Sequence, residues 1–127
     1  MITEMKTPDG PDNAARDVKA ALRVDLRSAM KRRQTIAAKV IRGLIAAIDN
    51  AEASPNRAVS AAHEPHRFEA GSAEVQRLRL SRADVRAVLA SELREREDAA
   101  NELERLGRTE HAEALRTEAH LVKRYLE

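Results

Sequence analysis

The side chains best able to hold a metal ion or to act in acid–base catalysis are few and poorly spaced in this sequence. His63, Glu64 and His66 form the segment HEPH, with a Pro between the second and third of these positions. A zinc-binding H-E-x-x-H motif needs its two His one helical turn apart on a helix, which this segment does not provide. His111 and His120 are single residues in a helical stretch. We therefore predict no metal site and identify no catalytic residue.

Other reactive groups are also missing from the composition. The chain has no Cys, which excludes disulfides, thiolate metal ligands and a cysteine nucleophile. Its four Gly are scattered, and none belongs to a phosphate-binding G-x-x-x-x-G-K loop. We therefore expect no cofactor.

Positive charge is concentrated in the front part of the chain. Residues 14–52 carry nine Lys or Arg and four Asp or Glu, a net charge of +5, whereas residues 81–127 carry nine and eleven, a net of −2. Two explanations remain open: the halves attract each other within the fold, or the front half binds an anionic partner such as RNA. The candidate contacts for RNA or another partner are Lys31, Arg32, Arg33 and Lys39.

The triplet at 31–33 has a purely structural explanation as well, because cations stabilise the C-terminal end of a helix. The only Tyr, Tyr125, is far along the chain from these cations, so stacking on single-stranded bases is not predicted. Contact with the backbone of a folded RNA remains open.

Apolar residues recur at helical spacing in four segments. They predict helices from about Ala14 to Arg33, from Thr35 to Glu52, from Ser81 to the residue before Gly107, and from Thr109 to the end of the chain. Asp12 or Asn13, Thr35, Ser81 and Thr109 are the candidate N-caps. Asp84 completes a capping box with Ser81, and Gly107 fits the left-handed residue that ends a helix.

These segments predict an all-α fold in which four main helices form two antiparallel hairpins packed together. Residues 53–80 contain Pro, Gly and Ser without a sustained period and are expected to form a long flexible loop between the second and third helices. Residues 1–13 are expected to be a disordered tail before one domain, 14–127. No apolar run approaches the roughly 20 residues of a membrane span, and the start lacks a signal sequence, so we expect a cytoplasmic protein.

Several segments, in order, resemble the YqeY family, also called the GatB/YqeY domain. They are DLRSAMKRR, RGLIAAIDNAEA and the long stretch that begins DVRAVLASELRERED and ends HLVKRYL, and the resemblance runs from about Ala20 to Leu126. The most specific marks are Ala29-Met30-Lys31, Arg42 with the aliphatic residues that lead to Asn50-Ala51-Glu52, Glu92 with Arg96, and Tyr125-Leu126.

The resemblance implies a set of recurrent polar positions on otherwise apolar helices: Arg42, Asn50, Glu52, Glu92 and Arg96. We interpret them as one hydrogen-bonded cluster where the two hairpins meet, which would fix the register between them. The alternative is a ligand or partner site. Glu92 and Arg96 also have the spacing and order of a favourable helical ion pair.

Members of the family typically continue into a second helical domain, shared with the tail of the B subunit of the tRNA-dependent amidotransferase, where it is implicated in contacting tRNA. This sequence ends at Glu127, so that tail domain is expected to be absent. The resemblance implies a non-catalytic helical module, accessory to the tRNA-dependent amidotransferase or to other tRNA-linked machinery. The family label, carbon–nitrogen ligase activity with glutamine as amido-N-donor, is implied by resemblance only. A protein-interaction or self-association module without an RNA role, and an enzyme in its own right, are the alternatives.

Overall fold

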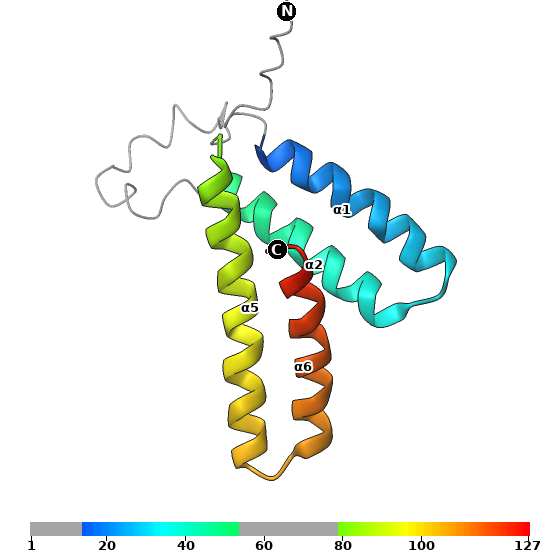
Figure 1. Ribbon diagram of the computed structural model, residues 1–127, viewed down its shortest axis with the longest axis vertical. Helices are drawn as coiled ribbons and strands as arrows, with labels where there is room; N and C mark the ends of the chain where they lie inside the picture. Colours follow the sequence, from blue (N-terminus) through cyan, green and yellow to red (C-terminus); the bar gives the residue numbers. More distant parts are fainter. Residues whose placement is uncertain (1–13, 54–78) are drawn as a thin grey trace, which may run out of the picture.

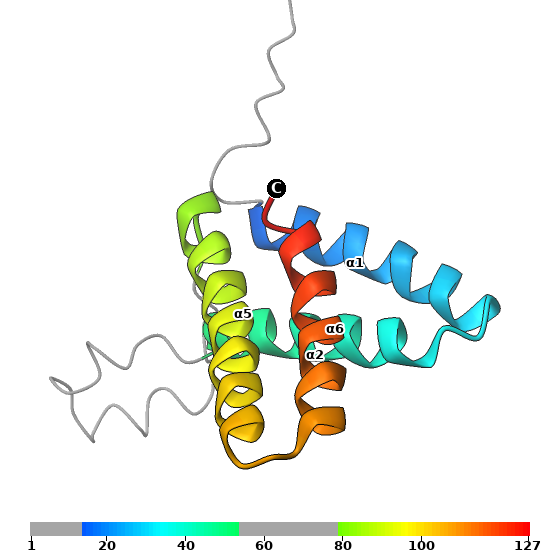
Figure 2. The ribbon, with the colours of Figure 1, turned by 60° about the horizontal axis from the view of Figure 1, so that its bottom comes forward.

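Four α-helices make up the part of the chain that the computed structural model describes, residues 14–53 and 79–127. They are α1 (Ala14–Lys31), α2 (Thr35–Ala53), α5 (Arg82–Arg105) and α6 (Thr109–Arg124). Helices α1 and α2 form one antiparallel hairpin, α5 and α6 form a second, and the two hairpins cross (Figures 1 and 2). The predicted all-α fold of two packed hairpins is confirmed.

Several predictions concern residues outside these ranges. They are the tail at 1–13 with its cap at Asp12 or Asn13, the HEPH segment, and most of the loop predicted at 53–80. At the two ends of that predicted loop, Ala53 is the last residue of α2 and Leu80 is buried.

Helix α2 is the central element, because it contacts all three of the other helices. Val40, Leu44 and Ile48, spaced one turn apart, are completely excluded from solvent. Most of the large apolar side chains of α2 are buried, whereas α1, α5 and α6 bury narrower stripes. The two hairpins therefore share one aliphatic core, to which α1 contributes Leu22, α5 Leu89 and α6 Val122.

The turn between α1 and α2 ends α1 with a Schellman motif. The backbone N–H of Gln34 donates to the carbonyl of Ala29 at 2.8 Å, and that of Arg33 donates to Met30 at 3.1 Å. This pattern requires a left-handed residue, and Arg33 takes that conformation with φ 57°. Helix α1 therefore ends at Lys31, two residues before the predicted end at Arg33.

The second hairpin confirms the predicted Ser81 capping box and the predicted helix end at Gly107. Asp84 N–H donates to Ser81 Oγ at 3.0 Å, while Ser81 N–H donates to Asp84 Oδ2 at 2.9 Å. Gly107 has φ 79°, and the N–H of Arg108 closes the motif on the carbonyl of Leu103.

The predicted caps at Thr35 and Thr109 are wrong by one residue. The carbonyl that accepts the first intrahelical hydrogen bond belongs to Gln34 in α2 and to Arg108 in α6. The two Thr are therefore the first residues inside their helices. In both cases the preceding Schellman motif sets the position of the next helix, and this backbone constraint overrides the side-chain preference of Thr.

Candidate functional site

The closed end of the first hairpin carries a dense group of cations. Lys31, Arg32 and Arg33 are all exposed, as is Arg27, which lies one turn before Lys31 on the same face of α1. Among the residues that the structure describes, none of the four has an ion-pair partner. We call these four residues the basic end. Sequence reasoning missed Arg27, although its spacing of four from Lys31 was a usable signal.

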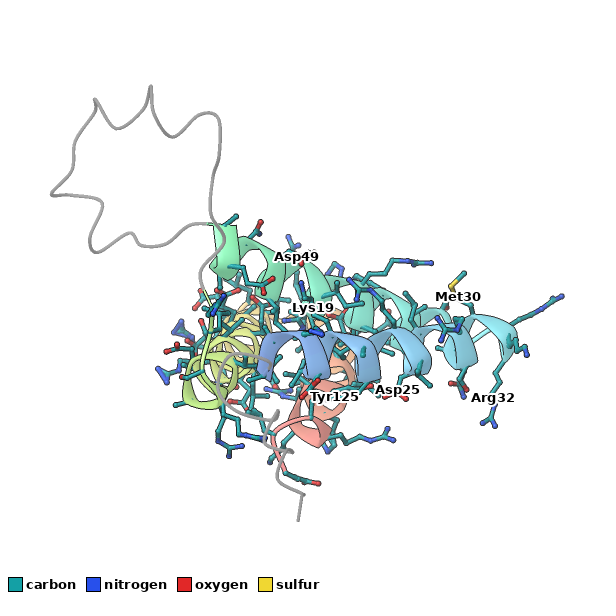
Figure 3. All side chains as sticks on the ribbon, turned by 90° about the horizontal axis from the view of Figure 1, so that it is seen from above. Lys19, Asp25, Met30, Arg32, Asp49 and Tyr125 are labelled. Atoms are coloured by element: carbon teal, nitrogen blue, oxygen red, sulfur yellow. The ribbon has the colours of Figure 1, made fainter. Side chains whose placement is uncertain are left out.

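The turn of the first hairpin carries most of the basic end, and its Arg32 also lines a cavity shared with α6. Figure 3 shows Met30 and Arg32 at the tip of the first hairpin, beyond the point where the two hairpins cross. Backbone hydrogen bonds fix both ends of the turn: the Schellman motif closes α1, and Ala38 N–H donates to the carbonyl of Gln34 at the start of α2. The protein therefore presents these cations beside a hydrogen-bonded turn, where none of them is taken up in an ion pair of the described chain.

Lys39, the fourth predicted contact residue, is not part of the basic end, because it forms an ion pair with α6. Its Nζ lies 3.1 Å from Glu118 Oε2 of α6, and Glu118 Oε1 accepts from Arg96 Nε at 3.3 Å. Arg96 Nη1 pairs with Glu92 Oε1 at 3.0 Å, which confirms the predicted helical ion pair. The side chains of Glu118 and Arg96 are only 11% and 16% exposed. We call Lys39, Glu92, Arg96 and Glu118 the ionic network.

The ionic network joins three helices from both hairpins. Arg96 of α5 lies against α2, since its Nη2 is 3.6 Å from the position that a Cβ on Gly43 would occupy. Glu118 is the only polar or charged residue classed as buried among those the structure describes. Because a buried carboxylate is costly unless it is paired, its position opposite Arg96 fixes how the second hairpin packs on α2.

The structure corrects the prediction that Arg42, Asn50, Glu52, Glu92 and Arg96 form one cluster. Only Glu92 and Arg96 belong to the ionic network. Arg42 is exposed and donates from Nη2 to the sulfur of Met30 at 3.7 Å, within the first hairpin. Asn50 is exposed, and Glu52 accepts from Lys19 at 2.7 Å. The helical period explains the separation of Arg42, because it lies about half a turn from the core residue Leu44.

Lys19 of α1 binds two carboxylates of α2. Its Nζ lies 2.6 Å from Asp49 Oδ1 and 2.7 Å from Glu52 Oε1, and its side chain is 13% exposed. Burial alone would lower the pKa of Lys19, but the hydrogen bonds and the attraction of the two carboxylates raise this pKa above 10.5. Lys19 is thus a structural cation of the first hairpin that sequence reasoning missed.

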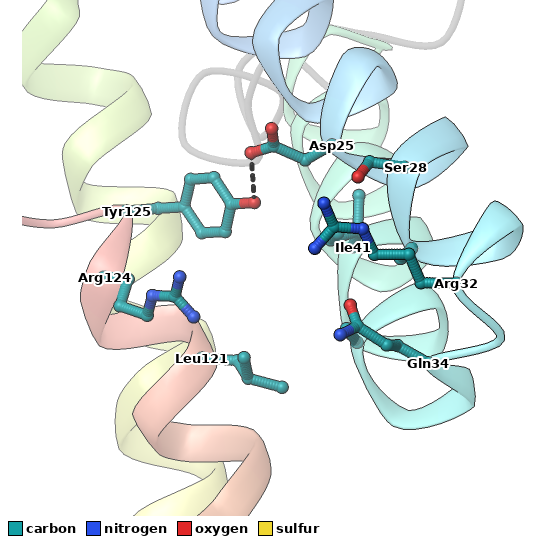
Figure 4. A pocket seen from close by; sticks show the side chains of 10 residues that line it. Asp25, Ser28, Arg32, Gln34, Ile41, Leu121, Arg124 and Tyr125 are labelled. Atoms are coloured by element: carbon teal, nitrogen blue, oxygen red, sulfur yellow. Dashed lines mark hydrogen bonds between the residues drawn. The ribbon is translucent and has the colours of Figure 1, made fainter.

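A cavity of about 480 Å³ opens where α1, the start of α2 and the end of α6 approach each other (Figure 4). Tyr125, one residue after α6, crosses to α1 and donates its hydroxyl to Asp25 Oδ2 at 2.6 Å. This bond lies on the edge of α1 opposite Lys19 (Figure 3). Arg32 of the basic end lines the same cavity, together with Arg124. The fold thus places the only Tyr beside the basic end, which the distance along the sequence did not predict.

We expect the phenol of Tyr125 to remain protonated at pH values where a free Tyr ionises. Burial, followed by the hydrogen bond to Asp25, raises the pKa of Tyr125 well above 10.0. Because the folded pKa is raised, the stabilisation is complete below pH 10.0 and is lost as the pH rises through the folded pKa. The ultraviolet absorbance of the phenolate measures this ionisation directly, since the chain has one Tyr and no Trp.

Asp25→Asn supplies the comparison, because it removes the negative charge that opposes ionisation. We expect the phenolate of this variant to appear at lower pH than in the parent protein. In the parent protein we expect it to appear together with the loss of helical circular dichroism. Ionisation of fully folded parent protein with a midpoint near pH 10.0 would contradict the contact.

Metal-binding and membrane-spanning features can be assessed for residues 14–53 and 79–127. Within these ranges, no three His, Cys, Asp or Glu are grouped so that they could hold a metal ion. His111 and His120 are exposed, and His120 Nδ1 lies 3.3 Å from the carbonyl oxygen of Arg116. None of the helices seen here combines the length and the apolar character needed to cross a bilayer.

The fold and its polar contacts define a class of protein: a small all-α module of two crossed hairpins, joined by partly buried ion pairs, with exposed cations at one end. Residues 19–127 match the family model described as Yqey-like protein. The chain therefore belongs to the YqeY family, and the resemblance seen in its sequence is confirmed. Comparisons with curated proteins and with solved structures give no significant match.

Proposed function

We propose that this YqeY-family protein is a docking module that binds folded RNA, with tRNA as its first candidate, through the basic end. The observation that carries the proposal is the exposure of Arg27, Lys31, Arg32 and Arg33, none of which is neutralised by a carboxylate of the described chain. Lysine and arginine in such a group bind the phosphate backbone and release its counterions, which supplies most of the affinity for nucleic acid.

Two other cations of the first hairpin are paired within the fold, whereas Arg16, Arg23 and Arg42 are exposed and form no ion pair among the described residues. Lys19 is paired with Asp49 and Glu52, and Lys39 is paired with Glu118, so these two residues stabilise the fold. The basic end has no such structural partner in the described ranges, although like charges so close together repel one another. An external polyanion would relieve this repulsion.

We further propose that the module acts within tRNA-linked machinery, such as the tRNA-dependent amidotransferase. This step rests on family resemblance alone. The chain has no Cys that could serve as the nucleophile for releasing ammonia from glutamine. We propose an accessory, non-catalytic role that brings RNA and partner protein together.

Neutralising the basic end tests the proposal. In the variant Arg27→Gln/Lys31→Gln/Arg33→Gln, we expect the affinity for tRNA to fall by roughly ten- to a hundredfold at about 100 mM salt. The slope of log affinity against log salt should also decrease by about 2 to 3, because each lost phosphate contact removes about one unit. Fluorescence anisotropy with labelled tRNA at several salt concentrations measures both quantities.

A matched control makes the same charge change on the second hairpin. Arg82, Arg94 and Arg108 are exposed and form no ion pair among the described residues. Their triple replacement by Gln should change the affinity less than about threefold. Equal losses in the two variants would mean unspecific attraction, and the absence of tRNA binding at about 50 mM salt would contradict the proposal.

A protein partner is the competing function, because Val24 and Met30 are apolar but 55% and 53% exposed on α1. A partner bound through such apolar side chains would still bind the neutralised variant. If the neutralised variant still binds a cellular protein but no longer binds tRNA, protein binding and RNA binding are separate functions of this chain.

A further inference from the structure

The cavity beside the basic end combines two arginines from different hairpins with the only aromatic residue of this region. Arg32 belongs to the turn after α1, and Arg124 is the last residue of α6. Figure 4 shows both guanidinium groups directed into the space between the hairpins. Neither arginine forms an ion pair among the described residues. An anionic group, above all a phosphate, can bind two guanidinium groups that are directed into the same space and have no counterion.

Asp25 cancels only half of this positive charge. With two arginines and one carboxylate, the titratable lining apart from Tyr125 has a net charge of +1. The carboxylate already accepts the hydroxyl of Tyr125 at 2.6 Å. This hydrogen bond fixes the position of the aromatic ring at the edge of the cavity. An anionic ligand therefore meets a lining with a net charge of +1, because a carboxylate that accepts a hydrogen bond stays negatively charged.

The remaining lining suits a flat, partly apolar group. Ile41 and Leu121 contribute apolar surface, and Gln34 contributes an amide with both donors and an acceptor. The volume of about 480 Å³ lies in the range of about 300 to 1,000 Å³ that is typical of small-ligand sites. Single-stranded nucleotides are recognised by this combination: arginine for the phosphate, an aromatic or apolar surface for the base, and amides for the base edges.

We infer that this cavity binds one unpaired nucleotide of the RNA that docks on the basic end. Its phosphate lies between Arg32 and Arg124, and its base lies against Leu121, Ile41 and Tyr125. The inference rests on the proposed function and adds a second contact to it, because a duplex alone cannot enter the cavity. Arg32 belongs to both sites, and Arg124 belongs to the cavity alone.

Titration with adenosine monophosphate tests the cavity without RNA. We expect binding, followed by NMR shifts of the lining residues, that is at least about tenfold weaker in Arg124→Gln and in Arg32→Gln. Lys123→Gln is the matched control, since Lys123 precedes Arg124 but lines a different surface depression on α5 and α6. It should leave the affinity within about twofold. Circular dichroism verifies folding, and all three replaced side chains are on exposed residues.

Inorganic phosphate separates the contribution of the base. It should bind more weakly than adenosine monophosphate, and equal affinities would overturn the nucleotide assignment. Absence of nucleotide binding at millimolar concentration, or binding that is unchanged in both Arg variants, would overturn the site.

An RNA hairpin with and without a short single-stranded tail then tests the connection to RNA. The tail should raise the affinity of the parent protein and give no gain in Arg124→Gln. A tail without effect on the parent protein would overturn the inference. Binding of the blunt hairpin through Arg27, Lys31 and Arg33 depends only on the proposed function, so failure of the cavity and failure of the basic end are measured separately.

Discussion

Replacing Leu44 by Ala lowers the free energy of unfolding by about 3 to 4 kcal/mol, the loss expected when a large buried side chain leaves a cavity. Leu44 is completely excluded from solvent and lies in the middle of α2, the helix that contacts all three others. Walls contributed by several helices cannot all move inward together, so little of the new cavity is filled by relaxation. Urea unfolding followed by circular dichroism measures the loss, with the slope against urea unchanged.

The same chemical change at Leu106 provides the control. Leu106 is 63% exposed at the end of α5, so Leu106→Ala removes little buried surface. We expect its cost to remain below about 1 kcal/mol. Similar losses at Leu44 and Leu106 would mean that α2 does not hold the central position.

Replacing Glu118 by Ala is expected to cost about 2 to 4 kcal/mol, because it removes the buried partner of a largely buried ion pair. Arg96 has a side chain only 16% exposed and would lose its Nε acceptor, while its bond to Glu92 remains. Lys39 adds little to the cost, since its side chain is 71% exposed and regains water. Chemical unfolding of the purified variant measures the loss.

Two further variants separate the unpaired charge from general damage to α6. The double variant Arg96→Leu/Glu118→Leu should recover most of the stability, because an apolar pair can replace a buried ion pair at little cost. Glu113→Ala removes a carboxylate that is 67% exposed and 3.6 Å from Arg116, and should cost less than about 0.5 kcal/mol. A double variant as unstable as the single one would show that Glu118 does not act through Arg96.

Most of the architecture follows from local sequence rules. The apolar period places all four helices, and Ser81, Asp84 and Gly107 are local signals that the structure confirms. The end of α1 is less predictable, because Arg33 adopts a left-handed conformation that usually selects Gly or Asn. There the tight connection of the hairpin overrides residue preference.

The site was predicted only in part, because its contacts join residues far apart in sequence. Lys31, Arg32 and Arg33 are neighbours in the chain, and their exposure follows from a short turn. The pairing of Tyr125 with Asp25 spans 100 positions and depends on how the hairpins cross. Glu118 did carry a signal, since it interrupts the apolar stripe between Leu115 and Val122. The position of Glu118 on this apolar face predicts that the carboxylate is buried. It does not predict that Arg96 is the partner of this carboxylate.

The central position of α2 also has a consequence for synthesis on the ribosome. Residues 14–53 are made before the second hairpin, and the complete burial of Val40, Leu44 and Ile48 belongs to a fold in which α5 and α6 also pack on α2. Until residues 82–124 have left the exit tunnel, the first hairpin exposes an aliphatic surface without its cover, the kind of surface that chaperones bind and that promotes aggregation. The α5–α6 hairpin has a tight turn at Gly107 and a capping box at the start of α5, so these contacts are local, and its docking on α2 completes the fold.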